Sequence, residues 1–171
     1  GDDFQGCEID SGGLSGGIMA TGNYRGRARN ADELRQDYEK AFSLIPGRQR
    51  ANIHAIYLDP QGKKVERDEI EIRHFEGWMD WAKKLGISLD FNSTIFSHPK
   101  AEGYTLANYD EGIRGYWVEH AKRCRKIGQE MGRRQGNPCM LNHWIPDGSK
   151  EYPMDSIERR SLYVKSMDEI I

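Results

Sequence analysis

Three short segments of the chain mix hydrophobic and polar residues in a strand-like pattern, and a longer segment with helical spacing follows each of them. The pattern predicts β-strands at 52–58, 87–92 and 139–144. One face of the second strand is mainly hydrophobic and consists of Ile87, Leu89 and Phe91. The other face is polar and consists of Ser88, Asp90 and Asn92. We expect the hydrophobic face to pack against helices, because the polar face is too hydrophilic for an ordinary core.

Hydrophobic residues recur at helical spacing in four longer segments. The predicted helices follow Asn30, cover 68–85 and 109–134, and extend from about residue 155 to the chain end. Asn30 and Asn108 are favourable N-terminal caps, and Gly86 is a favourable C-terminal cap. The order is therefore helix, strand, helix, strand, helix, strand, helix, after an opening of about 30 residues that is dense in glycine.

Strands that alternate with helices indicate a parallel sheet with right-handed crossovers, which is typical of the α/β class. A doubly wound sheet fits this order, and so does part of a (β/α)8 TIM barrel. A complete barrel needs about 250 residues, whereas this chain has 171. We expect residues 1–171 to form a single domain, with 1–30 as a glycine-rich active-site loop and 31–171 as a helix followed by three βα units.

Composition narrows the classes of partner. The chain has 25 Lys and Arg residues against 27 Asp and Glu residues, a balance that offers no electrostatic footprint for nucleic acid. No stretch of about 18 apolar residues occurs, so no membrane partner is expected. The cysteines Cys7, Cys124 and Cys139 form no CxxC pair, which favours a cytoplasmic protein over a disulfide framework or a structural zinc site. The chain starts with Gly1 and shows no signal segment, so both ends are interpreted as fragment boundaries.

Polar or aromatic side chains end all three predicted strands, and active sites of (β/α)8 barrels lie at such strand ends. The first strand carries His54 and Tyr57, the second ends at Asn92, and the third carries Asn142 and Trp144. Taken alone, His54 is more often a structural histidine, and Trp144 is more often a packing residue. A functional histidine would act as an acid or a base near neutral pH.

Three further features have more ordinary interpretations. His98 lies just past a strand, and a structural and a functional role are equally favoured there. The acidic residues of the opening could bind a hard cation, but such loops are usually only solvated; they are Asp2, Asp3, Glu8 and Asp10. The segment 11–17 lacks the Lys-Ser/Thr of a P-loop, so a flexible loop is the stronger prediction there.

Several strings of the sequence are specific when taken together. They are GGI at 16–18 with ATGNY at 20–24, HAIY at 54–57, LDFN at 89–92, FSHP at 96–99 and WIPDG at 144–148. In this order and at this spacing they resemble bacterial L-rhamnose isomerase over essentially the whole chain. No single string is diagnostic, but the ordered set makes a chance similarity improbable.

The resemblance implies a (β/α)8 barrel that interconverts L-rhamnose and L-rhamnulose with two divalent cations, usually Mn2+. It implies that His54 ends the second barrel strand and lies near the sugar ring oxygen for ring opening. It also implies a pocket around the terminal methyl group of the sugar, lined by Phe4, Leu14, Ile56, Tyr57 and Trp144. Asn92, His98 and Asn142 match positions around the site. An apolar pocket would reject a sugar that carries a hydroxyl at this position.

The chain departs from the family pattern at Arg25, Ser93 and His143, which affects loop rigidity more than chemistry. The resemblance also implies that the metal ligands lie beyond Ile171 and that the first barrel strand precedes Gly1. We therefore expect a fragment with barrel strands two to four, which is inactive by itself. Its uncovered sheet edges predict marginal stability or self-association, and a homo-oligomer is expected. Two alternatives stay open: a non-catalytic deoxy-sugar-binding or assembly module, and another sugar isomerase of the xylose isomerase type.

Overall fold

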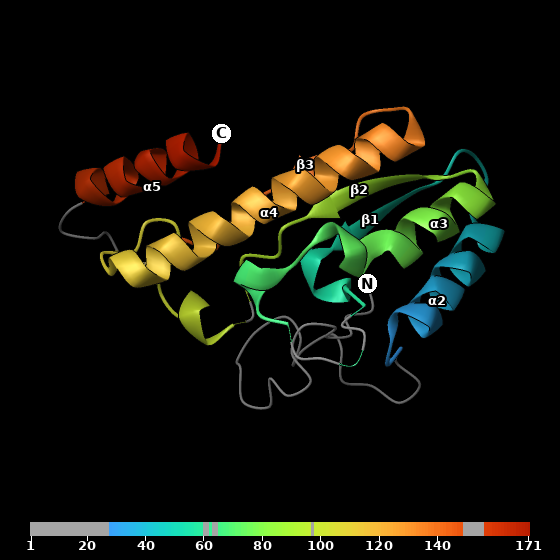
Figure 1. Cartoon of the computed structure of the whole chain (residues 1–171), viewed down its shortest axis with the longest axis horizontal. Coiled ribbons are helices and arrows are strands. Elements are labelled where there is room, and N and C mark those ends of the chain that lie inside the picture. The colour runs from blue at the N-terminus through green and yellow to red at the C-terminus, as the bar shows by residue number, and fades with distance from the viewer. Residues whose placement is uncertain (1–27, 60–61, 63–64, 97, 149–155) are drawn as a thin grey trace.

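The computed structural model describes residues 28–59, 62, 65–96, 98–148 and 156–171 (Figure 1). Its helices are α2 (Ala31–Leu44), α3 (Glu76–Leu85), α4 (Glu111–Gln135) and α5 (Ser156–Ile170). Its strands are β1 (Arg50–His54), β2 (Ser88–Asn92) and β3 (Leu141–Asn142). Short 3-10 helices are η1 (Ala55–Tyr57), η2 (Arg67–Glu69), η3 (Ile72–Phe75) and η4 (Pro99–Ala101). The predicted active-site loop, including Phe4 and Leu14, lies outside the described residues apart from its last positions.

The three strands form one parallel sheet in the order β1-β2-β3. Helix α3 connects β1 to β2, and α4 connects β2 to β3. The prediction of an α/β fold with parallel strands is therefore confirmed, and the described sheet is open rather than closed. No helix within the described ranges is long and apolar enough to cross a membrane.

Local sequence explains where the helices begin and end. Asn30 caps α2, because its side-chain oxygen accepts a hydrogen bond from the backbone N–H of Glu33 (2.9 Å). Asp110 caps α4 in the same way, so the expected cap at Asn108 is wrong by two residues. Gly86 ends α3 at a φ of 68°, a left-handed conformation that glycine adopts without strain.

Three of the predicted elements differ from the structure. The first strand starts at Arg50 and ends at His54, because the chain then turns into η1. The helix expected over 68–85 consists of η2, η3 and the shorter α3. The strand expected over 139–144 is reduced to Leu141–Asn142, because it pairs with β2 only at Phe91 and Asn92, where β2 ends.

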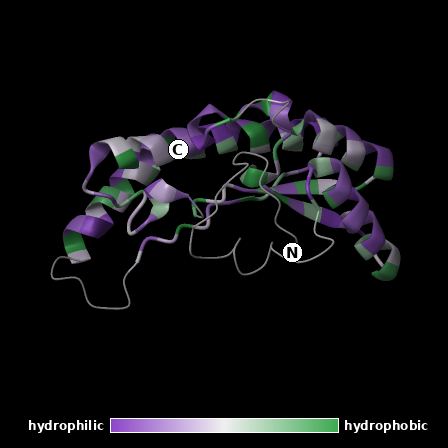
Figure 2. Ribbon diagram, turned by 90° about the horizontal axis from the view of Figure 1, so that it is seen from below, coloured by the Kyte–Doolittle hydropathy of each residue, from purple (hydrophilic) through white to green (hydrophobic). Residues whose placement is uncertain are grey.

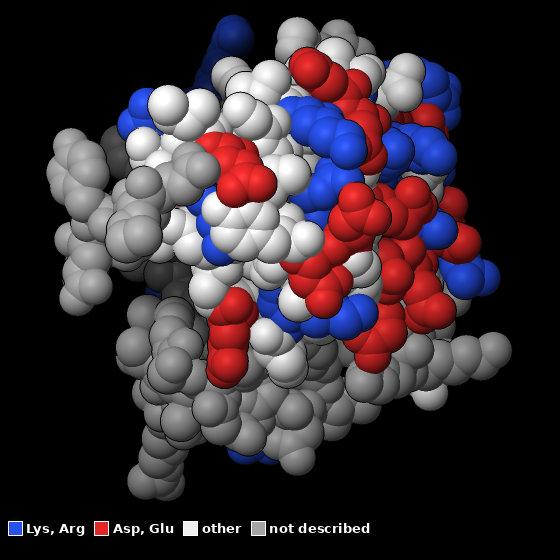
Figure 3. Space-filling view, turned by 90° about the vertical axis from the view of Figure 1, so that its left-hand side faces the viewer, with Lys and Arg blue, Asp and Glu red and all other residues white. Residues whose placement is uncertain are grey.

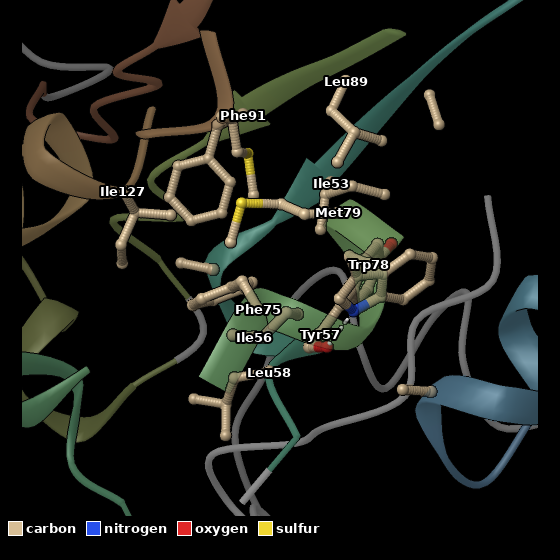
Figure 4. Close-up of a cluster of buried hydrophobic side chains, with 14 of the residues drawn as sticks. Ile53, Ile56, Tyr57, Leu58, Phe75, Trp78, Met79, Leu89, Phe91 and Ile127 are labelled. Carbon is tan, nitrogen blue, oxygen red and sulfur yellow. Dashed lines mark hydrogen bonds between the residues drawn. The ribbon is translucent and has the colours of Figure 1, made fainter. Parts of the chain in front are cut away.

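One face of the sheet is covered by helices, and we call it the covered face. It carries Ala51, Ile53, Leu89 and Phe91, all at most 1% exposed. Together with α3 and α4 they form the main hydrophobic core, in which the ring of Phe91 meets that of Phe75 edge to face at 5.0 Å (Figure 4). Figure 2 shows the helices arching over one side of the strands. Tyr38 of α2 joins this core through ring contacts with Trp78 and Trp81.

A second hydrophobic cluster lies where α4 begins and α5 packs against it. It contains Ile95, Leu106, Trp117, Ala121 and Ile170, together with Tyr116 and Val118. An ion pair between Arg114 and Glu169 (2.9 Å) joins the two helices at this point. Seen from the α5 side, acidic side chains gather on one part of the surface, and basic side chains border them (Figure 3).

Candidate functional site

The register of the sheet places the polar ends of the three strands in one row. His54 of β1 is opposite Asn92 of β2, and Asn92 is opposite Asn142 of β3. Neighbouring strands lie about 4.8 Å apart, so the row extends over roughly 10 Å. These residues alternate with the residues of the covered face, and no described helix packs over them. We call this side of the sheet, with Arg50, Asn52, His54, Ser88, Asp90, Asn92 and Asn142, the open face.

His54 is half-buried at the carboxyl end of β1, where its ring contacts Tyr57 of η1 and two residues of the loop after β2. Its Nδ1 atom lies 3.1 Å from the Thr94 hydroxyl, which is a hydrogen-bond distance. The Tyr57 ring lies 5.1 Å from the imidazole centroid, and the Phe96 ring lies 6.4 Å away in an edge-to-face arrangement. An imidazole held in this way has a defined orientation on the open face.

An aromatic cluster follows the same strand ends and consists of Tyr57, His54, Phe96 and Trp144. The rings of Phe96 and Trp144 meet at 4.6 Å and 75°. Trp144 is 61% exposed, whereas Tyr57 is buried and its carbonyl accepts a hydrogen bond from the Trp78 indole (2.8 Å). The cluster therefore extends from the hydrophobic core to an exposed indole at the edge of the open face.

The loop after β2 has an unusual backbone conformation at Thr94. Its φ is 52°, which is a left-handed value that β-branched residues rarely adopt. The Asn92 side-chain oxygen accepts a hydrogen bond from the Thr94 backbone N–H (2.8 Å), and the Thr94 hydroxyl lies 3.2 Å from the Asn92 carbonyl. Asn92, which the sequence nominates for substrate binding, thus also stabilises this turn.

Two buried side chains, those of Arg67 and His120, bind backbone carbonyls of the loop after β2. Arg67 is fully buried and donates hydrogen bonds to the carbonyls of Thr94 (2.5 Å) and Phe96 (3.3 Å). The His120 ring contacts the carbonyls of Arg67 (2.7 Å) and Ser93 (2.5 Å). The position of Thr94 is therefore determined by several independent hydrogen bonds.

His98 and Ile56 lie apart from this row. His98 is buried against Tyr116, and its Nδ1 atom accepts a hydrogen bond from the Lys100 backbone N–H (3.1 Å). Burial, and next the charge of Arg67, lower the pKa of His98 to about 4. Ile56 is 1% exposed and belongs to the main core. The structure therefore brings His54, Tyr57, Asn92, Asn142 and Trp144 together at the strand ends, and it places the other two inside the protein.

Arg50, the first residue of β1, and Asp90, in the middle of β2, form an ion pair on the open face. The guanidinium binds both carboxylate oxygens, at 2.6 and 2.8 Å. The Met140 backbone N–H donates a further hydrogen bond to Asp90 (2.8 Å). The hydrogen bonds from Arg50 are the main reason why the pKa of Asp90 is lowered, although burial opposes this shift.

The described residues offer no site for a metal ion. Within them, no group of three or more His, Cys, Asp or Glu side chains lies close enough together to coordinate one. The donors among the described residues therefore do not form a site for the two divalent cations that the sequence resemblance implies.

Comparison with known proteins decides the family. The family model described as L-rhamnose isomerase (RhaA) matches residues 1–171. The L-rhamnose isomerases of Bacteroides thetaiotaomicron and Rhodopirellula baltica are 54% and 52% identical to this chain, and each match covers 99% of it. That of Mannheimia succiniciproducens is 48% identical over the entire chain. This chain belongs to the L-rhamnose isomerase family.

The matches also show how much of each relative this chain corresponds to. The chain spans about 40% of the length of these curated relatives. The prediction that the sequence corresponds to part of an L-rhamnose isomerase is therefore confirmed.

Three residues that shape the site were not nominated from the sequence: Thr94, Phe96 and Arg67. An asparagine often stabilises a turn by binding the backbone N–H two residues later in the chain. The position of Asn92 two residues before Thr94 fits this pattern and could have pointed to Thr94. Phe96 appears in the sequence only as part of a family string. Arg67 gave no indication of its role, because a lone arginine after a loop is usually solvated.

Proposed function

We propose that this chain supplies the ring-opening and methyl-recognition part of an L-rhamnose isomerase site, with His54 as the catalytic residue. The observation that carries the proposal is the position of His54. In a chain of this family, its imidazole lies at the carboxyl end of a parallel strand, where it belongs both to the row of polar side chains and to the aromatic cluster. Active sites of (β/α)8 barrels occupy this end of the strands.

Ring opening of a pyranose is a proton-transfer reaction that a histidine can perform. The bond between C1 and the ring oxygen breaks while the anomeric oxygen forms a carbonyl with C1. The anomeric hydroxyl therefore loses a proton, and the ring oxygen gains one. His54 would accept the first proton and deliver it to the ring oxygen, because an imidazole is both an acid and a base near neutral pH.

The aromatic cluster supports recognition of a 6-deoxy sugar. Tyr57, Phe96 and Trp144 offer ring surface beside His54, and Trp144 keeps an exposed face. A methyl group loses nothing when it is buried against such rings, whereas a hydroxyl would lose its hydrogen bonds to water. In our proposal Phe4 and Leu14 complete the methyl pocket, and Asn92 and Asn142 lie around the sugar. Ile56 and His98, which the resemblance also implied, support the site from inside the protein instead of contacting the sugar.

The complete reaction needs parts that the described residues do not contain. In our proposal, the three strands are strands two to four of a (β/α)8 barrel, and the whole protein is a cytoplasmic homo-oligomer. It interconverts L-rhamnose and L-rhamnulose. Its two divalent cations, Mn2+ in our proposal, would have ligands outside the described residues.

A chimera tests this function directly. Residues 1–171 replace the matching segment of the Bacteroides thetaiotaomicron relative, and formation of L-rhamnulose from L-rhamnose is measured with Mn2+. The chimera should be active, and His54→Gln should lower its kcat/KM at least about 100-fold, the range of a lost acid–base group. His143→Gln is the matched control, because the resemblance implies an apolar residue at that position.

The other outcomes are equally informative. The isolated chain should form no L-rhamnulose with Mn2+, and activity of that preparation would contradict the fragment interpretation. An active chimera in which His54→Gln and His143→Gln behave alike would remove His54 from the mechanism. An inactive chimera together with an isolated chain that binds L-rhamnose would favour the deoxy-sugar-binding alternative. Turnover of D-xylose in preference to L-rhamnose would contradict the proposed substrate.

A further inference from the structure

The Thr94 hydroxyl lies between two groups that make different demands on its single proton. One is the Asn92 carbonyl oxygen at 3.2 Å, and the other is Nδ1 of His54 at 3.1 Å. A carbonyl oxygen only accepts hydrogen bonds, whereas a neutral imidazole nitrogen either donates or accepts, depending on the tautomer. The three atoms therefore have one self-consistent arrangement of protons.

In that arrangement the hydroxyl donates to the Asn92 carbonyl, and its oxygen accepts from His54. In the reverse arrangement the hydroxyl would donate its hydrogen bond to Nδ1 instead. The Thr94 hydroxyl oxygen and the Asn92 carbonyl oxygen would then face each other 3.2 Å apart with no hydrogen between them. Nδ1 of His54 must then carry a hydrogen. In a neutral ring with a hydrogen on Nδ1, Nε2 carries the lone pair.

We propose that Thr94 is a positioning residue that holds His54 as the Nδ1–H tautomer, so that Nε2 is its basic atom. The consequence for catalysis rests on the proposed function. In ring opening, Nε2 would accept the proton of the anomeric hydroxyl and then return it to the ring oxygen. The opposite tautomer would present an N–H at Nε2, and it could not remove that proton.

The surroundings of Thr94 are consistent with a fixed role. A β-branched residue at a φ of 52° is strained, and such a conformation persists only where the structure around it enforces it. Here Asn92 binds the Thr94 N–H, Arg67 binds the Thr94 carbonyl, and the residue is fully buried. Strain that is held from both sides at a candidate catalytic group indicates that the hydroxyl position matters.

Nitrogen NMR of the histidine side chains tests the tautomer without sugar, metal or turnover. The chain contains only five histidines, so His54 can be assigned from the resonances that disappear in His54→Gln. In the wild-type chain, Nδ1 should resonate in the N–H range and Nε2 in the lone-pair range. Because the measurement needs no activity, its failure is distinguishable from a failure of the proposed function.

Two substitutions at Thr94 provide the contrast. Thr94→Val keeps the shape but removes the acceptor, and it should lower the ratio of Nδ1–H to Nε2–H tautomer about tenfold, which corresponds to about 1.4 kcal/mol. Thr94→Ser keeps the hydroxyl and should retain the wild-type ratio. The resonances of His74 and His98 should be unchanged in both variants, which shows that the fold is intact.

Two results would overturn the inference. One is a wild-type spectrum in which His54 is the Nε2–H tautomer. The other is a ratio of Nδ1–H to Nε2–H tautomer in Thr94→Val that equals the wild-type ratio. If Thr94→Val does not fold, Thr94→Ala replaces it, since Ala also lacks the hydroxyl and is smaller. The wild-type spectrum decides the tautomer in any case.

Discussion

The two faces of the sheet differ in what their side chains do, although they come from the same strands. On the covered face, Ile53, Leu89 and Phe91 are at most 1% exposed and pack against helices. On the open face, Asn52 and Asn142 are exposed, and Arg50 and Asp90 form a solvent-accessible ion pair. The covered face therefore supplies buried hydrophobic area, whereas the open face keeps polar side chains such as Asn52 and Asn142 accessible to water.

The difference shows how a parallel sheet can keep its core side chains apart from its accessible polar side chains. Successive side chains of a strand point to opposite faces, so each strand can serve both purposes without compromise. Burial of hydrophobic area stabilises the covered face by about 25 cal/mol per Å2. Polar groups that stay in water cost little, which leaves the open face free to match a ligand instead of the core.

The largest expected effect is a difference in the free energy of unfolding between a substitution on the covered face and one on the open face. Phe91→Ala should lower the free energy of unfolding by about 3–5 kcal/mol, because it leaves a cavity beside Phe75 in the core. Asn52→Ala on the open face should change it by no more than about 0.5 kcal/mol. Urea unfolding followed by circular dichroism measures both values. Similar losses in the two variants would show that the faces do not differ in this way.

A second prediction uses acid to probe the helix-covered region, where His98 is buried. Its pKa of about 4 lies below the ordinary value of 6.5, so the folded state favours the neutral ring. As pH falls from 6.5 to 4, the unfolded state takes up this proton first, and stability should fall by about 3 kcal/mol from this group. Below pH 4 both states are protonated, and this contribution stays constant.

His98→Asn isolates that contribution. The Asn side-chain oxygen can still accept the hydrogen bond from the Lys100 N–H, but it does not titrate. Urea unfolding at pH 7, 5.5 and 4 should therefore show a weaker loss of stability in the variant than in wild type. An identical pH dependence in both proteins would mean that His98 is not held neutral.

The smallest expected effect lies on the open face at Asp90. Arg50 lowers the pKa of this carboxyl, so its stabilising contribution is complete above the ordinary carboxyl pKa and is lost as pH falls toward the lowered one. The loss should be less than about 1 kcal/mol, because the pair is accessible to water. Comparing wild type with Asp90→Asn between pH 5 and 2 measures it. A loss of stability at Asp90 as large as the loss expected from His98 would contradict the view that charges on the open face matter little for stability.

Much of this architecture could be predicted because it depends on residues close together in sequence. The alternation of Ser88, Leu89, Asp90, Phe91 and Asn92 fixed which side chains share a face. Asn30 and Gly86 marked helix ends by local hydrogen bonding and backbone conformation. Strand ends were less predictable, because the length of β3 depends on where it meets β2, which is far away in sequence and ends at Asn92.

The site shows the same division. The sequence by itself determined the α/β class, the family, and the polar side chains that gather at the strand ends. Only the tertiary structure decided that Thr94, 40 residues away in the chain, meets His54, and that Arg67 and His120 hold the loop between them. It also decided that Ile56 enters the core, because the backbone turns directly after His54. Periodicity and caps depend on neighbouring residues, whereas these contacts depend on helices that return the chain to the same edge of the sheet.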